Sequence, residues 1–255
     1  MPMTRLGRIL FAGGLAGMGV LSLIYHDFGM NWQPVPDWVP LRPILGSLSG
    51  AILLAGGLGV FVDRFSAWAA MLLAGFVTLW LLVLQVPRVA ANPGDAGVWL
   101  GWGENAMLVA GGWTVWISRA GARDAHGAAL ARSPKKLRAT RILYGVALPV
   151  IGLSHFVYAD FTASMIPGWI PGRLPLAYLT GAGHMAAGVA VLLGIVPRLG
   201  ATLEAIMVSL FVLLLHLPGV IHAPTDRLQW TMLCVACALC GAAWTMAGSL
   251  ERTKS

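Results

Sequence analysis

Long apolar segments alternate with short connections rich in Pro, Gly and charged residues along the whole chain. A helix needs about 20 mainly apolar residues to cross a bilayer. The segments that meet this length are 9–27, 43–62, 65–87, 98–118, 140–159, 174–196, 199–221 and 229–249. Their only glutamates are Glu104 and Glu204. The pattern therefore predicts an all-α polytopic membrane protein with eight transmembrane helices.

The composition excludes other classes of protein. Of the 255 residues, 58% are hydrophobic and 11% are charged, with a mean hydropathy of +0.77, whereas a soluble domain is about a quarter charged. This excludes a soluble globular enzyme and a disordered chain. The net charge of +7 does not indicate nucleic-acid binding, because the basic residues lie between apolar segments without a polar scaffold to present them.

Lysine and arginine are concentrated on one predicted side of the membrane. That side, which includes both termini, contains Arg5, Arg8, Arg64, Arg119, Arg123, Arg132, Lys135, Lys136, Arg138, Arg141, Arg198, Arg252 and Lys254. The opposite side contains Arg42, Arg88, Arg173 and Arg227, together with several aspartates. By the positive-inside rule, both termini are cytoplasmic and the chain is integral to the cytoplasmic (inner) membrane.

The two halves of the chain resemble each other, since residues 8–116 match residues 141–247 with small changes of register. The matched positions include Tyr25, Asp27, Trp38, Arg42, Pro87, Trp99 and Trp113 in one half and Tyr158, Asp160, Trp169, Arg173, Pro218, Trp230 and Trp244 in the other. We interpret this as a tandem duplication: a first four-helix repeat at 1–118, a basic cytoplasmic linker at 119–139 and a second four-helix repeat at 140–255. Because each repeat has an even number of spans, both repeats enter the membrane from the same side and are parallel rather than inverted.

The first outer connection of each repeat contains a Pro-x-Trp-(Val/Ile)-Pro element, at 36–40 and at 167–171. Proline interrupts helices and tryptophan favours the membrane interface, so this element predicts a short interfacial or re-entrant segment at the outer face. Small residues four positions apart, such as Gly13 and Gly17 or Gly46 and Gly50, predict close helix packing within the bilayer.

The second repeat contains the main candidates for a functional site. His155 and His216 lie near the outer ends of the fifth and seventh predicted spans. His184 lies ten residues into the sixth, roughly 15 Å deep and close to the midplane. His222, Tyr158 and Asp160 lie at the outer boundary. Because intramembrane ionisable residues usually face an interior or a cavity, this set predicts a polar column that leads inward from the outer face.

Imidazole suits several tasks at such a site. It can ligate haem or a transition metal, hydrogen-bond a quinone carbonyl or relay protons, because its ordinary pKa is near 6.5. The same histidines can also be packing groups that hydrogen-bond within the helix bundle. The spacing of His216 and His222 matches no metal-ligand signature, so no metal site is assigned.

The first repeat contains secondary candidates: Tyr25, His26, Asp27, Gln85 and Glu104. Tyr25 and Asp27 lie where the first helix reaches the outer face, and a phenol and a carboxylate there can bind a head group or a quinone ring. Glu104 lies early in its span, where it can be protonated or paired with Arg88 or Arg42.

Two other sets of residues fall within the second-repeat spans. We interpret Glu204, near the inner end of its span, as a solvated carboxylate or an interfacial ion pair with Arg198. Cys234, Cys237 and Cys240 lie along one stripe of a helix. Within an apolar helix this spacing favours buried packing over a soft-metal or redox role.

The second repeat resembles the DoxX-like family of four-helix membrane proteins, named for the small subunit of a terminal quinol oxidase. The resemblance rests on Leu153-Ser154-His155-Phe156, Ile166-Pro167-Gly168-Trp169-Ile170-Pro171, Tyr178-Leu179-Thr180-Gly181 and Leu215-His216-Leu217-Pro218. It extends to the first repeat through the duplication. His184 stands where the family often has a glutamate, and the first repeat has Ser22 and Gln85 in place of His155 and His216. The resemblance implies quinone-linked redox chemistry.

Two functions remain open from the sequence. The first is an accessory subunit in quinone-linked electron transfer, with the lipid bilayer, quinone and other membrane redox subunits as partners and with quinone or haem as cofactor. Its site would contain His155, His184 and His216. The second is a transporter or a non-catalytic membrane assembly or scaffold protein. A stand-alone enzyme is disfavoured, because the sequence contains no phosphate-binding loop, Ser-His-Asp set or paired intramembrane carboxylates.

Overall fold

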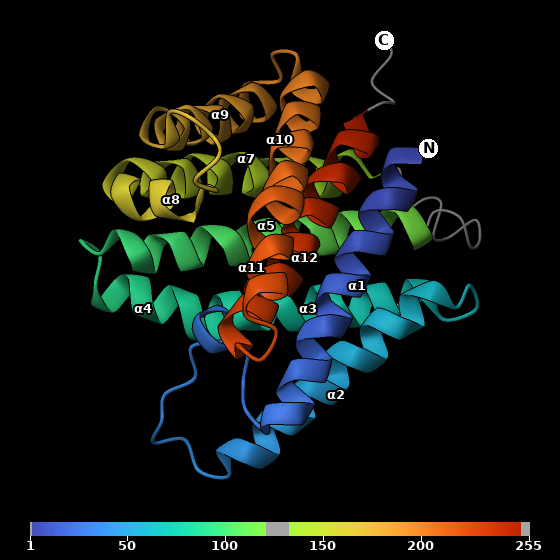
Figure 1. Ribbon diagram of the computed structural model, residues 1–255. Coiled ribbons are helices and arrows are strands. Elements are labelled where there is room, and N and C mark those ends of the chain that lie inside the picture. The colour runs from blue at the N-terminus through green and yellow to red at the C-terminus, as the bar shows by residue number, and fades with distance from the viewer. Residues whose placement is uncertain (1, 121–132, 251–255) are drawn as a thin grey trace.

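The computed structural model describes residues 2–120 and 133–250, and every regular element within them is a helix (Figure 1). The first half forms α1 (Pro2–Tyr25), the 3-10 turn η1 (Met30–Trp32), α2 (Arg42–Phe61), α3 (Ser66–Trp80), the π-helical segment η2 (Leu81–Gln85), α4 (Val86–Ala91) and α5 (Ala96–Ala120). The second half forms α7 (Pro134–Val157), α8 (Ala159–Met165), α9 (Arg173–Leu193), α10 (Pro197–Phe211), the π-helical segment η3 (Val212–His216), α11 (Leu217–His222) and α12 (Arg227–Ser249). Helices suit a bilayer because they satisfy the backbone internally.

Seven stretches of the described chain are long and apolar enough to cross a membrane. They are Met3–Tyr25, Arg42–Phe61, Ser66–Ala91, Lys135–Val157, Arg173–Leu193, Pro197–His222 and Arg227–Ser249. Each lies over one of the predicted spans, and the third and sixth continue through the π-helical segments into α4 and α11. The chain is therefore an integral membrane protein of helical type.

The fourth predicted span, α5, is absent from that set. Its 25 residues form about 37 Å of helix, but Glu104, Asn105 and several Gly and Trp residues lower its hydropathy. Neighbouring helices bury much of α5, and its buried residues include Asn105 and Met107. A helix enclosed by protein can carry polar side chains that a lipid-facing helix cannot, which explains why the composition of α5 departs from that of the other spans.

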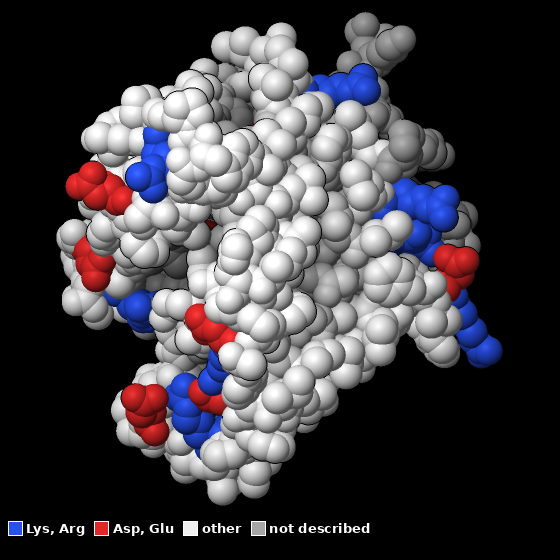
Figure 2. All heavy atoms as spheres, in the orientation of Figure 1, with Lys and Arg blue, Asp and Glu red and all other residues white. Residues whose placement is uncertain are grey.

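The surface is divided into charged margins and an apolar belt. In the view of Figure 2, charged side chains gather at two opposite edges and the surface between them is almost free of charge. Large apolar side chains such as Leu58, Leu82 and Leu203 are more than half exposed. A continuous exposed apolar surface of this kind marks contact with lipid.

The helices surround two interiors that share a common wall. α5 and α12 contact each other and form this wall. The first bundle consists of α1, α2 and α3 on one side of it, and the second bundle consists of α7, α9 and α10 on the other. The first helix of each half packs both on the second helix of its own half and on the last helix of the other half, α1 on α12 and α7 on α5. The two halves are therefore interlocked rather than separate.

Glycine determines how closely the helices approach one another. A Cβ atom at Gly241 would collide with the backbone of Phe11, so only glycine lets α12 reach α1 at this point. Gly17, Gly46 and Gly50 also face close neighbours, as predicted. The prediction for Gly13 is wrong, because a Cβ there would meet open space.

Both π-helical segments precede a proline. Val86 donates its backbone N–H to the carbonyl of Leu81, and Leu217 donates to that of Val212, so each bond spans five residues. Pro87 and Pro218 follow directly, and a proline ring clashes with the carbonyl four residues earlier in an α-helix. The wider turn relieves that clash without ending the helix.

Hydrogen bonds recur at positions that the sequence match pairs between the halves. Trp113 donates its indole N–H to Thr78, and Trp244 donates to Ser209, each at 3.0 Å. The indoles of Trp99 and Trp230 likewise donate to carbonyls of the preceding turn, each at 2.8 Å. The matched residues therefore play the same local roles.

The connections differ more than the helices do. In the first outer connection, η1 turns inward and buries Gln33, whereas the second half has the short helix α8 at this place. Trp38 and Trp169 are both largely exposed. Of the predicted linker 119–139, residues 121–132 lie outside the described residues, and α5 and α7 occupy its two ends.

Candidate functional site

A buried histidine and a buried glutamate meet inside the second bundle. Nδ1 of His184 on α9 lies 2.9 Å and 3.1 Å from the two carboxylate oxygens of Glu204 on α10. The side chain of Glu204 is fully buried and that of His184 is 4% exposed. A buried carboxylate is stable only beside a strong donor or a positive charge, so the pair holds a proton between the imidazole and the carboxylate.

The short hairpin between α9 and α10 brings these two residues together. Gly194 and Val196 adopt left-handed backbone conformations, with φ of 71° and 43°, and reverse the chain direction. His184 lies nine residues before the end of α9 and Glu204 lies seven residues after the start of α10. At 1.5 Å per residue, both side chains reach a similar depth from the turn.

The interpretation of Glu204 as a solvated or interfacial carboxylate is wrong, because this residue is 1% exposed. Its hydrogen-bond partner within the described chain is His184 rather than Arg198. The pair could have been predicted from the sequence, because positions 184 and 204 lie at similar distances from the turn between the two predicted helices and therefore opposite each other.

His155 on α7 lies directly beside the pair. Its ring centroid is 4.9 Å from that of His184, and its Nδ1 lies 3.0 Å from the hydroxyl of Thr180. Phe211 covers both imidazoles, with ring centroids at 6.2 Å and 6.0 Å. His155 is half-buried while His184 is buried, so His155 presents the more accessible imidazole of the cluster.

Two glycines allow this arrangement. A Cβ atom at Gly152 would lie 2.6 Å from the carbonyl oxygen of Gly181, and one at Gly181 would lie 2.8 Å from Cβ of His155. α7 and α9 can therefore approach until the two imidazoles touch. Tyr144, also on α7, is buried and interacts electrostatically with Glu204. Its hydroxyl and Nε2 of His184 have no hydrogen-bond partner within the described chain.

The other predicted members of the polar column lie apart from this cluster. His216 lies at the end of η3 and makes no hydrogen bond or ring contact with His155 or His184 among the described residues. His222 is exposed at the end of α11. The hydroxyl of Tyr158 lies 3.5 Å from a carboxylate oxygen of Asp95. Of the six predicted residues, His155 and His184 are the two that a ring contact joins within the described chain.

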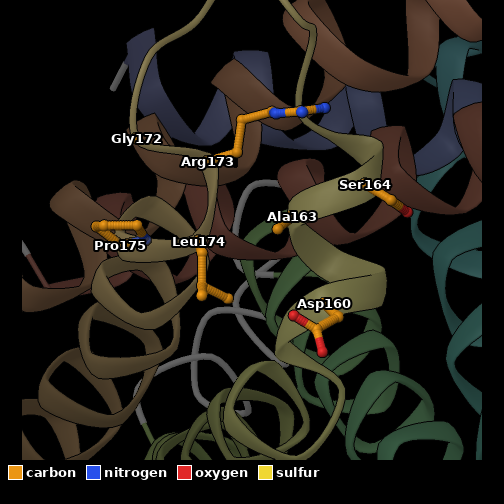
Figure 3. Close-up of a pocket in the computed structure, with 7 residues that line it drawn as sticks. All are labelled: Asp160, Ala163, Ser164, Gly172, Arg173, Leu174 and Pro175. Atoms are coloured by element: carbon orange, nitrogen blue, oxygen red, sulfur yellow. The ribbon is translucent and has the colours of Figure 1, made fainter.

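Asp160 belongs to a surface pocket between α8 and the start of α9 (Figure 3). The lining residues are Asp160, Ala163, Ser164, Gly172, Arg173, Leu174 and Pro175. Arg173 and Asp160 contribute one charge of each sign, and both are exposed. The pocket is a feature of the surface and does not contain the buried histidines.

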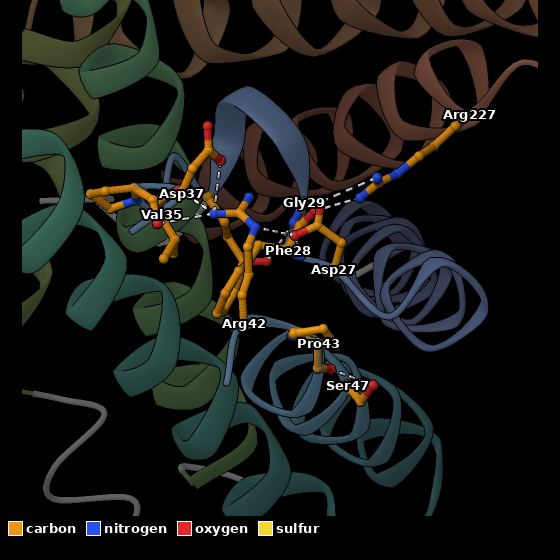
Figure 4. Close-up of polar contacts among 11 residues, drawn as sticks. Asp27, Phe28, Gly29, Val35, Asp37, Arg42, Pro43, Ser47 and Arg227 are labelled. Carbon is orange, nitrogen blue, oxygen red and sulfur yellow. Dashed lines mark hydrogen bonds and ion pairs between the residues drawn. The ribbon is translucent and has the colours of Figure 1, made fainter. Parts of the chain in front are cut away.

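In the first half, Asp27 is the centre of an ionic cluster just beyond the C-terminal end of α1 (Figure 4). Arg42 lies 2.9 Å from one carboxylate oxygen and Arg227 lies 3.3 Å from the other. Partial burial raises the pKa of Asp27, but the backbone N–H of Phe28 and the two guanidinium groups outweigh it, so the pKa falls below its ordinary value of 3.8. Arg227 also lies over the ring of Tyr25, at 4.8 Å.

The remaining first-half candidates are placed singly. Nδ1 of His26 lies 3.0 Å from the hydroxyl of Ser47. Gln85 is completely buried, and both atoms of its amide lack a hydrogen-bond partner within the described chain. Glu104 accepts a hydrogen bond of 2.6 Å from the indole of Trp32. The predicted pairing of Glu104 with Arg88 or Arg42 is wrong, because the loop that carries Trp32 turns inward and supplies the partner.

The three cysteines do not converge. Cys234 faces Gly17 on α1, whereas Cys240 lies 3.2 Å from the hydroxyl of Ser209 on α10. All three are free thiols, and no group of three or more His, Cys, Asp or Glu residues in the described chain is arranged to hold a metal ion. The rings of His155 and His184 also touch, which leaves no space between them for a haem held by both.

Comparison of the chain with family models, with curated proteins and with solved structures finds no match.

Proposed function

We propose that the chain is a DoxX-like membrane protein that binds the head group of a quinone at His155, in front of the His184–Glu204 pair. In this proposal it acts as an accessory subunit in quinone-linked electron transfer. The observation that carries the proposal is the buried contact of 2.9 Å between His184 and Glu204 beside a more accessible imidazole. Bound quinone would supply the redox chemistry, which consumes or releases protons as well as electrons.

The residues of the cluster suit a quinone head group. Thr180 donates its hydroxyl hydrogen to the carbonyl of Ala177, so its oxygen can accept from Nδ1–H of His155. That tautomer leaves Nε2 of His155 as a proton acceptor toward a ligand hydroxyl. Phe211 supplies an aromatic surface at the same place.

The matched positions of the first half support a functional role for the pair. Leu53 and Leu73 stand where the second half has His184 and Glu204, and both leucines are completely buried. The same helix hairpin is therefore stable with an apolar pair. Because burying ionisable groups usually costs stability relative to apolar ones, the pair in the second half is better explained by chemistry than by packing.

The number of membrane spans and their orientation are part of the same proposal. We infer eight spans, with α5 as the fourth, arranged as two parallel four-helix repeats in the cytoplasmic membrane with both termini on the cytoplasmic side. The recurrent hydrogen bonds of Trp113 and Trp244 and the two π-helical segments support the duplication. The distribution of Lys and Arg supports the orientation.

The test is quinone binding to protein purified in mild detergent. We expect extraction to release quinone from the wild-type protein, or added quinol to bind, and His155→Ala to weaken quinol binding roughly tenfold because the hydrogen bond from a quinol hydroxyl to Nε2 of His155 is lost. His222→Ala is the matched control, because this exposed histidine lies outside the cluster. Protein that neither contains nor binds quinone would contradict the proposal and would favour the transporter or scaffold alternative.

A further inference from the structure

The first half places one ionisable side chain beside the second bundle. Glu104 lies on α5, the helix that forms part of the wall between the two bundles. One of its carboxylate oxygens accepts the indole N–H of Trp32 at 2.6 Å. Glu104 is half-buried. A carboxylate inside a membrane protein is a functional candidate.

Packing contacts place Glu104 at the depth of the histidine cluster. A Cβ atom at Gly103, next to Glu104, would lie 3.0 Å from Ile151 on α7. A Cβ atom at Gly152, the next residue of α7, would lie 3.1 Å from Cβ of His184. Glu104 and His184 therefore lie at the same level of the bundle, and Glu104 interacts electrostatically with His184.

The outer surface is open toward this level. Figure 2 shows a hollow over α5, bounded by α8, α4 and α11. Glu104 and His155 are both half-buried, whereas His184 and Glu204 behind them are buried. A ligand that enters between the two halves would meet the accessible groups first.

Trp32 fixes the position of this carboxylate. Its backbone carbonyl also accepts a hydrogen bond of 3.4 Å from the amide of Asn105, so η1 is tied to two successive residues of α5. The position matched to Glu104 in the second half is Val235, which is buried. The fold thus has an apolar alternative at this position, as it has for the His184–Glu204 pair.

We propose that the first half completes the site of the second: Glu104, positioned by Trp32, accepts a hydrogen bond from one hydroxyl of a quinol while His155 accepts one from the other. This inference rests on the proposed function and names the reduced, hydroxyl-bearing form as the ligand that the complete site prefers. A carboxylate can accept from a hydroxyl but not from a quinone carbonyl, which has no hydrogen to donate. Glu104 therefore distinguishes the two redox forms.

The experiment compares quinol and quinone affinities of the purified full-length protein, using a short-chain ubiquinone analogue kept reduced or oxidised under anaerobic conditions. We expect Glu104→Gln to weaken quinol binding about tenfold and to leave quinone binding unchanged or tighter, while Glu104→Asp restores part of the quinol preference. Trp32→Phe should give a smaller loss of quinol affinity.

The outcomes separate this inference from the proposed function. Equal quinol affinity in the wild type and Glu104→Gln, with His155→Ala still weakened, overturns the role of Glu104 and leaves the quinone site intact. Failure of the wild type to bind either form overturns both. A matched control is Asp95→Asn, which alters an exposed carboxylate at the start of α5 without reaching the hollow.

Discussion

At the scale of single residues, the second bundle contains an ionisable pair where the first contains two leucines. His184 and Glu204 hydrogen-bond to each other at 2.9 Å. At the matched positions, Leu53 and Leu73 are buried apolar side chains. Removing one partner of a buried pair leaves the other without compensation, while replacing both by apolar residues often costs nothing. The two halves thus provide an internal comparison of these solutions.

This comparison predicts the stability of three variants. Glu204→Leu alone should lower the free energy of unfolding by roughly 3 kcal/mol, because it leaves His184 unpaired in the interior. The double variant His184→Leu/Glu204→Leu should recover most of that loss, since it reproduces the apolar solution of the first half. Thermal unfolding in detergent measures both. A double variant less stable than Glu204→Leu would show that the pair has a structural role.

A second residue-scale prediction concerns Asp27 and pH. Because the folded-state pKa of Asp27 lies below 3.8, its ion pairs contribute stability above that value, and the contribution is lost as pH falls through the lower folded-state pKa. Asp27→Asn should therefore lower stability by about 1 kcal/mol at pH 7, and this deficit should shrink progressively as the pH falls below 3.8. Asp37→Asn, whose carboxylate is fully exposed, is the control. An Asp27→Asn deficit that does not shrink with acid would contradict this account.

Sequence reasoning found some members of the cluster and missed others for physical reasons. His155 and His184 were predicted because an imidazole within an apolar segment is conspicuous. Glu204 was assigned to the interface because it lies close to the predicted end of its span. That assignment did not consider which residue of the preceding helix lies opposite Glu204 across the α9–α10 hairpin. Trp32 lies in a connection whose inward turn at η1 depends on tertiary contacts, so no local pattern indicated it as the partner of Glu104.

At the scale of helices, apolar length predicted the elements well and glycine spacing predicted their contacts less well. The four-residue spacing cannot tell which face of a helix meets a neighbour, so Gly13 was predicted as a contact although Gly14 is the residue that faces α12. The π-helical segments were not predicted, since a proline inside an apolar run is compatible with several local adjustments.

The glycine contacts predict opposite effects for two similar substitutions. Gly241→Ala should destabilise the protein by several kcal/mol, because its Cβ would overlap the backbone of Phe11 and force α1 and α12 apart. Gly13→Ala should be neutral or stabilising by up to about 1 kcal/mol, because its Cβ meets open space and alanine favours helix. Unfolding curves should therefore show a lower stability for Gly241→Ala than for Gly13→Ala. Equal stabilities of the two variants would contradict the close packing of α1 on α12.

At the scale of the whole molecule, the two halves exchange partners. α1 packs on α12 and α7 packs on α5, and Arg227 joins the start of α12 to Asp27 at the end of α1. Neither half is therefore expected to form its bundle alone. This exchange was beyond sequence reasoning, because the match between the halves does not say whether each first helix packs within its own half or on the other.

The proposed topology predicts accessibility from the two sides of the membrane. Trp38→Cys and Trp169→Cys, both at largely exposed positions, should react with a membrane-impermeant maleimide from outside intact cells. Asp63→Cys, in the exposed connection between α2 and α3, should react only after the cells are opened. The native cysteines lie within α12 and serve as the background control. Labelling of position 63 from outside would reverse the proposed orientation.

The proposed function requires a quinone head group to bind beside the histidines of the second bundle. Photo-crosslinking with a photoreactive quinone analogue, followed by peptide mass spectrometry, tests it most directly. We expect labels on peptides that contain His155, His184 or Phe211, suppressed by excess unmodified quinone and reduced in the His155→Ala variant at the same analogue concentration. Labels confined to lipid-facing residues such as Leu58 or Leu82 would contradict the proposed quinone site. Labels whose formation excess quinone does not suppress would contradict it as well.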